Sequence, residues 1–517
     1  MTPTAAYVSD SGGPRASGVE ARFTMMASAL SALLIPLFLL RAPVIATWIA
    51  AATIVLVGMV LQRRDPVGAL TVLPVALLLG PIARIELTSS VALHFGDLYL
   101  GGLVMAEYLR AGAGVRLRLG RNAVPITLAI VLALISWLFA LDIVVSGVAM
   151  VALLEMLLMY LLTIGAVHHP RDVRRVMSGW LGAVVLSCIL IVLAYVLGRP
   201  LLIGSGQEGT ARAMEIKSST VYLYRASFFV TGFVYPLGGA IMIVLADLFG
   251  ADGSARFRLG RIAVLVTSAV AVAVLGTLTL AGALLVGFGL ALYWLRYAPR
   301  GGLRTATLLV AGVALVVLLG ILLRQLMPPA QFLALLGRIG QTSSFHARVV
   351  VWRNVVHFLL AHPGAAFVGV GPDATVRMGG NPVLFMLFQG PTGSREGAID
   401  SGYLYVVLNY GVPLLLVLAW IAFRTLTVLG RSMRHQFDAS AMAIWLCVAI
   451  WVPMAVTQES AVSKPIFMIV QLAALAEVFS RSEWGPSRRG HASALSSYGQ
   501  TSGSTRACQR KAISSDL

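Results

Sequence analysis

Apolar residues along this chain fall into successive runs of roughly 20 residues, and most charged side chains lie between the runs. A helix needs about 20 apolar residues to cross the hydrocarbon core of a bilayer, where its backbone groups must bond to each other. The pattern therefore predicts an all-α polytopic membrane protein with about 14 transmembrane helices. The predicted helices cover residues 24–40, 43–61, 67–83, 90–109, 123–141, 145–167, 176–197, 227–248, 262–278, 282–297, 303–323, 401–423, 440–458 and 464–480.

The connecting segments predict the orientation of these helices. Lys and Arg are concentrated in alternate segments, which the positive-inside rule assigns to the cytoplasm together with both termini. The polar ends, 1–23 and 481–517, are predicted to be disordered, and no cleavable signal is expected. Between them we expect a bundle of about 11 helices (24–323), an extracytoplasmic loop (324–400) and about three more helices (401–480). A loop of this length among short connections is typical of a functional segment.

Composition and charge exclude several other classes of protein. The chain is 58% apolar and only 12% charged, whereas soluble proteins are about 25% charged. Its formal net charge of +18 comes from basic residues spread between the apolar runs, which argues against nucleic acid and for a membrane lipid environment. The residues that could ligate a metal form no cluster with metal-site spacing. We therefore expect no metal and no cofactor.

The predicted outer loop contains an amphipathic helical pattern from about Ser344 to Ala361. Such a helix can lie at the membrane surface with a tryptophan at headgroup depth. His362-Pro363-Gly364 ends the pattern, and the sequence from Gly369 to Pro372 predicts a tight turn. Its predicted apolar face consists of Phe345, Val349, Trp352, Val356 and Leu359, with His346, Arg353 and His357 opposite and Arg348 at the border.

The next apolar run follows Asp400, which is expected at the outer mouth of the helix 401–423. The order of these short motifs resembles the O-antigen ligase and polysaccharide polymerase family. The resemblance covers Arg348-x-x-x-Trp352, His362-Pro363, Gly369-Val370-Gly371-Pro372, Asp400-Ser401-Gly402-Tyr403-Leu404 and Asn409-Tyr410-Gly411. Ligases of that family usually carry a His-Asn pair where this chain has Asp400-Ser401, so it looks more like an exopolysaccharide polymerase.

The resemblance implies a metal-independent, inverting GT-C-type glycosyltransferase of a bacterial cytoplasmic membrane. Its substrate would be a glycan on undecaprenyl diphosphate, and a flippase and a chain-length regulator would be its partners. Arg348 and Arg225 match arginines of the family. Arginine binds phosphate oxygens through a planar fork and can stabilise the leaving diphosphate without a metal. Arg353 and Arg212 are further candidates for this role, and Asp400 or His346 is the candidate base. Asp97 and Tyr403 are candidates to line a polar cavity.

Each candidate also has a purely structural interpretation. Arg348 can anchor an interfacial helix, and Asp400 can cap the helix that it precedes. Tyr403 is equally typical of an interfacial belt, while Asp97 can be paired within the fold. For the whole chain, we consider a polymerase of lipid-linked repeats first. The alternatives are a ligase that transfers a finished glycan to lipid A core or protein, and a transporter or lipid flippase.

Overall fold

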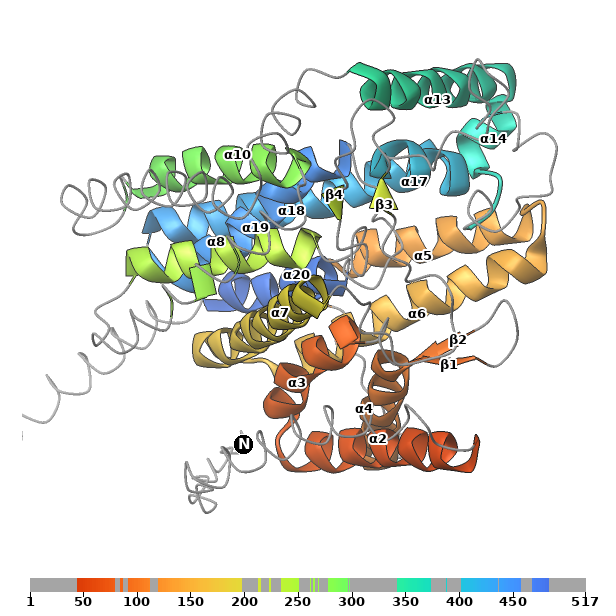
Figure 1. Ribbon diagram of the computed structural model, residues 1–517. Coiled ribbons are helices and arrows are strands. Elements are labelled where there is room, and N and C mark those ends of the chain that lie inside the picture. The colour runs from red at the N-terminus through yellow and green to blue at the C-terminus, as the bar shows by residue number, and fades with distance from the viewer. Residues whose placement is uncertain are drawn as a thin grey trace, which may run out of the picture.

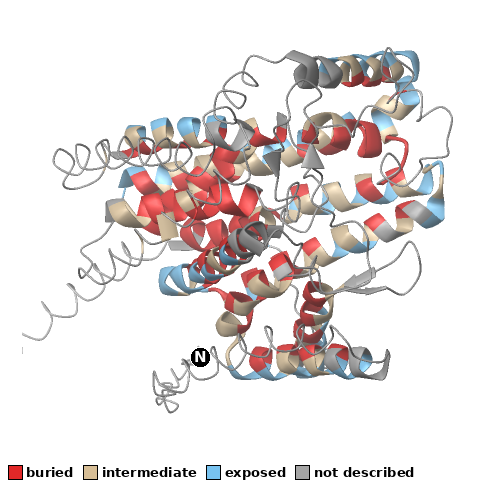
Figure 2. Cartoon of the chain, in the orientation of Figure 1, coloured by how far each residue is buried: buried red, intermediate tan, exposed pale blue. Residues whose placement is uncertain are grey.

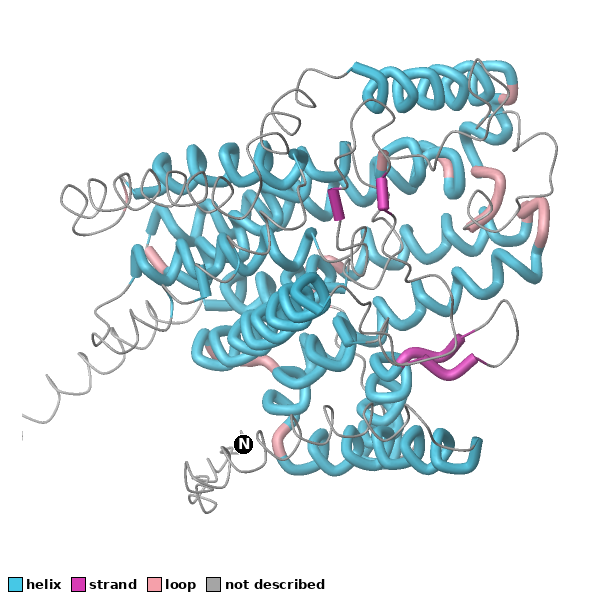
Figure 3. Tube along the Cα trace, viewed as in Figure 1, coloured by secondary structure: helices cyan, strands magenta, loops and turns pink. Residues whose placement is uncertain are grey.

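The computed structural model is built mainly from helices (Figure 1). Within the described residues it contains fourteen helices and two short antiparallel strand pairs (Figure 3). These helices are not the same fourteen segments that the sequence predicts, so the equal number is a coincidence. The structure describes residues 44–79, 84–86, 92–111, 120–197, 213–214, 223–224, 234–250, 261, 264–265, 268, 278–295, 297, 342–372, 387, 401–435, 437–456 and 467–482.

The bounds of the elements are as follows. The helices are α2 Val44–Arg64, α3 Pro66–Leu79, α4 Phe95–Ala111, α5 Ala123–Leu138, α6 Ile143–Ala166, α7 Pro170–Leu197, α8 Val234–Gly250, α10 Leu278–Leu295, α13 Thr342–Ala361, α14 Pro363–Val368, α17 Gly402–Tyr410, α18 Val412–His435, α19 Ala439–Val456 and α20 Phe467–Ser482. The strands are β1 Arg84–Glu86, β2 Ala92–His94, β3 Ala213–Met214 and β4 Leu223–Tyr224.

Most predicted helices that fall on described residues agree with the observed ones to within a few residues. Helix α4 begins later than predicted, because strand β2 pairs with β1 directly before it. Helix α7 begins earlier, at Pro170, where proline suits the first turn of a helix. The predicted helices 24–40 and 303–323, and most of 262–278, lie outside the described residues.

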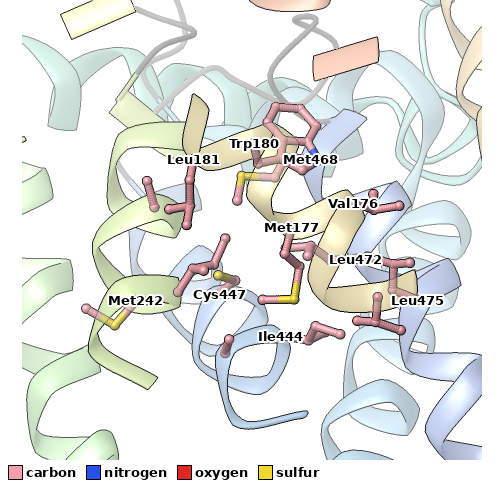
Figure 4. Close-up of a cluster of buried hydrophobic side chains, with 14 of the residues drawn as sticks. Val176, Met177, Trp180, Leu181, Met242, Ile444, Cys447, Met468, Leu472 and Leu475 are labelled. Atoms are coloured by element: carbon pink, nitrogen blue, oxygen red, sulfur yellow. The ribbon is translucent and has the colours of Figure 1, made fainter. Parts of the chain in front are cut away.

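The main core extends over many helices, and in the part formed by α7, α8, α19 and α20 the facing side chains are almost fully buried (Figures 2 and 4). The side chains that Figure 4 draws here are apolar apart from the indole N–H of Trp180. That indole nitrogen donates to Gln471 Oε1 at 2.6 Å, which ties α7 to α20. Gly239 of α8 lies so close to Met468 that a Cβ atom would come within 2.4 Å of it. The nearest atom is the terminal methyl of the Met468 side chain, so α8 and α20 are in direct contact here.

One end of this core carries ion pairs of α7 and α8, and of the residues directly before α3 and α19. Asp65, which precedes α3, pairs with Arg175 near the start of α7. The neighbouring Arg174 donates to Asp438, which precedes α19, at 3.4 Å. At the last turn of α8, Asp247 pairs with Arg261 at 2.6 Å. Since α7 and α19 begin at this end and α8 finishes there, neighbouring helices run in opposite directions.

Two helices within the described part of the chain are long and apolar enough to cross a membrane. They contain Ala149–Ala166 of α6 and Val412–His435, which is all of α18. Only 39% and 22% of these stretches are buried, whereas a core helix of a soluble protein would be mostly buried. Large apolar side chains are exposed along α5 and α6, among them Val124, Leu128, Val131, Leu138, Val144 and Val151. A water-soluble monomer rarely exposes so extended an apolar surface.

The predicted helix 401–423 is instead a hairpin of two helices, α17 and α18, which turns at Gly411. Trp445 Nε1 donates to Leu426 O at 3.0 Å, which sets α19 against α18. Tyr403 Oη donates to Val452 O at 2.7 Å. Helices α18 and α19 run in opposite directions and meet where Trp445 bonds to Leu426. Val452 therefore lies beside the first half of α18, several residues after Gly411. Tyr403 can reach it only if α17 folds back along α18.

The helix α10 also corrects a prediction about a bend. A single helix over 262–297 would be too long for a bilayer, so the sequence predicts a bend near Thr279–Gly282. The structure shows unbroken helix from Leu278 to Leu295. A bend between the two predicted helices would therefore have to precede Leu278.

Candidate functional site

The segment Gly369–Pro372 lies against the turn of the α17–α18 hairpin. Val370 N donates to Leu408 O at 2.8 Å, and Gly371 N donates to Asn409 O at 3.2 Å. These carbonyls belong to the last turn of α17, whose C=O groups do not all receive a hydrogen bond from a later N–H of the same helix. Two motifs that are far apart in sequence are therefore joined by backbone hydrogen bonds. We call this contact the latch.

Glycine is required on both sides of the latch. Gly369 has φ 84° and ψ 178°, and Gly411 has φ 89° and ψ 163°, a region of backbone conformation that is essentially restricted to glycine. A Cβ atom on Gly369 would lie 2.3 Å from Asn409 O, and one on Gly411 would lie 2.1 Å from Phe367 O. The two glycines thus let the two backbones approach each other at the same place.

The turn between α5 and α6 completes the latch. Leu141 N donates to Val370 O at 3.1 Å. Ser136 is fully buried in α5, and its hydroxyl donates to Asn409 O at 2.7 Å. Gly371, with φ 113°, lies against this turn, since a Cβ atom there would come within 2.4 Å of Ala140 Cβ. The α5–α6 turn had no signal in the sequence that linked it to the segment Gly369–Pro372.

Helix α13 packs over α17 with a different face from the predicted one. Val351, Val355 and Leu359 are buried and form an apolar cluster with Val407 and Leu408 of α17. Val349 and Val356, which the sequence assigns to the apolar face together with Leu359, are 39% and 43% exposed. The predicted helix is confirmed, since α13 spans Thr342–Ala361, and the stripe that packs on α17 shares only Leu359 with the predicted apolar face.

The register of α13 separates the candidate residues of this helix. Arg348 comes three residues before Val351 and seven before Val355, so its position belongs to the side of the helix that packs on α17. His346 comes seven residues before Arg353, whose side chain is exposed on the other side. The candidates Arg348 and His346 therefore occupy opposite sides of α13.

The beginning of α17 carries a serine cap. Ser401 is the N-cap residue, and its hydroxyl accepts a long hydrogen bond of 3.5 Å from Leu404 N. The interpretation of Asp400 as the cap is therefore wrong, and Asp400 itself lies outside the described residues. Tyr403 ties α17 to α19 through the hydrogen bond to Val452 O.

Arg212 and Arg225 also lie outside the described residues, but they adjoin paired strands. Ala213 is the partner of Tyr224, and Met214 is the partner of Leu223. Arg212 directly precedes Ala213, and Arg225 directly follows Tyr224. The structure therefore places the neighbours of both arginines in the sequence and not the arginines themselves. The sequence alone did not predict this pairing, because each strand has only two residues.

The remaining candidate, Asp97, is engaged in a local structure. Its carboxylate accepts from His94 N at 2.9 Å and lies 3.3 Å from His94 Nδ1. Asp97 is in the first turn of α4, where a negative charge is favourable. The contact with His94 agrees with the structural interpretation of Asp97 as a residue paired within the fold.

A small pocket lies at the opposite end of α5 from the latch. Glu477 of α20 accepts from Arg121 N at 3.2 Å and from Asn122 N at 3.1 Å. Arg424 of α18 also lines this pocket. The carboxylate therefore satisfies backbone donors at the beginning of α5, a structural role that the sequence did not predict. Its partner residues are more than 350 positions away.

No protein-family model matches this chain, and no curated protein matches it. The motif resemblance and the geometry of the site are therefore the basis for any functional assignment.

Proposed function

We propose that this protein is a membrane glycosyltransferase that polymerises oligosaccharide repeat units carried on undecaprenyl diphosphate. The reaction would take place at the outer face of a bacterial cytoplasmic membrane. In this proposal the chain crosses the membrane about 14 times, with both termini in the cytoplasm and residues 324–400 outside. The exposed apolar surface of α5 and α6 and the two membrane-length helices support the membrane setting.

The latch is the observation that carries the proposal. The resemblance rests on several short motifs, none of which is specific alone. Two of these motifs, Gly369–Pro372 and Asn409–Gly411, bond directly to each other. Unrelated motifs that match by chance have no reason to be adjacent in the fold. Their contact supports the interpretation of residues 342–411 as one functional unit.

The proposed chemistry uses arginines to hold the diphosphate. As the glycosidic bond breaks, negative charge grows on the leaving diphosphate, and a fixed guanidinium ion stabilises it. The register of α13 favours Arg348 over Arg353 for this role, because the position of Arg348 is on the side toward α17. Arg225 and Arg212, which adjoin one end of the β3–β4 pair, are proposed as a second contributor.

The acceptor sugar hydroxyl needs a base. Asp400 directly precedes the serine-capped first turn of α17, and α13 packs on this same helix. His346 belongs to the outward side of α13 together with Arg353. We therefore propose Asp400 as the base, with His346 as the second choice.

Two alternatives use other observations. A ligase would use the same diphosphate chemistry and differ only in its acceptor. A transporter or flippase would be favoured by the break between α17 and α18, because interrupted helices are typical of transporter sites. However, the residues at that break, Asn409, Tyr410 and Gly411, carry no charge that would hold an ion or anionic substrate.

The test uses purified protein in lipid and a synthetic lipid-linked repeat unit, with the chain length of the product as the measurement. We expect wild-type protein to produce chains of many repeats and Arg348→Ala to reduce the rate at least a hundredfold. Arg353→Ala should have a smaller effect. Arg434→Ala, at the exposed far end of α18, is the control and should match wild type.

Deletion of the gene separates the alternatives. Single repeat units on the surface, without long chains, would support a polymerase. Long chains that accumulate on the lipid carrier would show a ligase instead. A loss of repeat units from the outer face would show a flippase, and unchanged polysaccharide would reject all three.

A further inference from the structure

We infer that Ser136 is a positioning residue: through the latch it sets the placement of α17 relative to α13, the helix that carries Arg348. This inference rests on the proposed function and adds to it a residue of α5 that belongs to none of the motifs. The argument begins with the hydrogen bonds at the end of α17.

Donors from other segments bond to two carbonyls at the end of α17. The break at Gly411 leaves carbonyls of Leu408 and Asn409 without helical donors. Val370 N satisfies the first. Gly371 N and the Ser136 hydroxyl, at 3.2 and 2.7 Å, both donate to Asn409 O. Ser136 is the only one of these donors that comes from the helix bundle, and it holds the shortest bond.

The latch lies at one end of both α13 and α17. Helix α13 leads through the short α14 to Gly369, and α17 leads directly to Gly411. Arg348 is 14 residues before His362, toward the other end of α13. At 1.5 Å per residue, α13 forms an arm of about 20 Å from His362 to Arg348.

A small rotation at the latch is amplified along this arm. A tilt of about 5° displaces the end of a ~20 Å arm by nearly 2 Å. A misplacement of about 1 Å in a reacting group can reduce a rate on the order of a hundredfold. Loss of the side-chain hydrogen bond from Ser136 would therefore shift the far end of the arm, although Ser136 itself does not contact the substrate.

Ser146 provides a matched control. Like Ser136, it is a fully buried serine in the α5–α6 pair and close to the latch, since a Cβ atom on Gly371 would come within 2.9 Å of its hydroxyl. Its hydroxyl has no hydrogen-bond partner among the residues that the structure describes. Removal of this hydroxyl thus changes burial and volume as in Ser136→Ala but removes no latch bond.

The experiment compares wild type, Ser136→Ala, Ser136→Thr and Ser146→Ala as full chains in lipid, with the rates normalised to folded protein. For Ser136→Ala we expect kcat to fall about tenfold to a hundredfold, while KM for the lipid-linked repeat changes less than about twofold. Amide hydrogen exchange should rise in residues 366–372 and stay unchanged in α20. Ser136→Thr should recover most of kcat, and Ser146→Ala should match wild type.

Each outcome is decisive. An unchanged kcat for Ser136→Ala with active wild type would overturn the positioning role, even if exchange at 366–372 rises. Unchanged exchange, or equal losses in Ser146→Ala, would overturn it as well. Inactive wild-type protein on every lipid-linked repeat would instead reject the proposed function, and the positioning role with it.

Discussion

The substitution Gly411→Ala tests the latch most directly. The backbone of Gly411 has φ 89° and ψ 163°, and an alanine in this region costs about 1–3 kcal/mol. Its Cβ atom would lie 2.1 Å from Phe367 O, roughly 1 Å closer than an ordinary contact allows. The two segments must therefore separate.

Separation of the segments weakens the hydrogen bonds between them. The bonds from Val370 N to Leu408 O and from Gly371 N to Asn409 O measure 2.8 and 3.2 Å, and each contributes on the order of 1 kcal/mol. Together with the backbone strain, the expected destabilisation is about 3–5 kcal/mol. Because the damage is confined to one contact, we expect local opening of α14 and α17 rather than loss of the helix bundle.

Hydrogen exchange and thermal unfolding in detergent measure this prediction. Gly411→Ala should raise exchange in residues 363–372 and 402–410 and lower the unfolding temperature. The control is Gly364→Ala in α14, where a Cβ atom meets nothing within 4 Å. Alanine in a helix is favoured over glycine by about 0.5–1 kcal/mol, so this variant should be neutral or slightly stabilised. If both variants exchange like wild type, the latch does not hold these helices.

Two further predictions concern packing and capping. Val355→Ala should destabilise the contact of α13 with α17 by about 1–3 kcal/mol, because Val355 is fully buried. Val356 is 43% exposed, so Val356→Ala should change the stability of this contact by less than about 0.5 kcal/mol. Exchange in α13 measures both, and a larger effect at Val356 would contradict the observed face. Glu477→Ala removes two hydrogen bonds to the beginning of α5, so it should lower the unfolding temperature and cost about 1–3 kcal/mol of stability. Glu477→Gln should cost less stability. Equal losses of stability in the two variants would show that the side-chain oxygen is not the acceptor that matters.

The sequence predicted where many helices lie but not how they face each other. In α13 two apolar stripes run along the helix, one with Val351 and Val355 and the other with Val349 and Val356. Periodicity identifies both stripes but cannot choose between them. The choice is made by α17, which offers Val407 and Leu408 to one stripe only.

The α17–α18 hairpin escaped prediction for a related reason. The residues from Gly402 to Phe423 form one apolar run, and Asn409-Gly411 within it is compatible with a kink as well as with a reversal. Hydrophobicity carries no information about the direction of the chain. The direction is fixed by tertiary contacts, such as that of Tyr403 with Val452. The Ser136 and Glu477 contacts join segments more than 270 residues apart and are hidden for the same reason.

The residues behind the resemblance divide into two groups with different consequences. Gly369, Gly371 and Gly411 are explained completely by the geometry of the latch, since each has positive φ and lies against another backbone or side chain. This geometry would require glycine at these positions whatever the function of the protein. Arg348 and Asp400 have no such structural necessity in the latch. Substitution of the glycines therefore tests the fold, and only substitution of the arginine and the aspartate tests the chemistry.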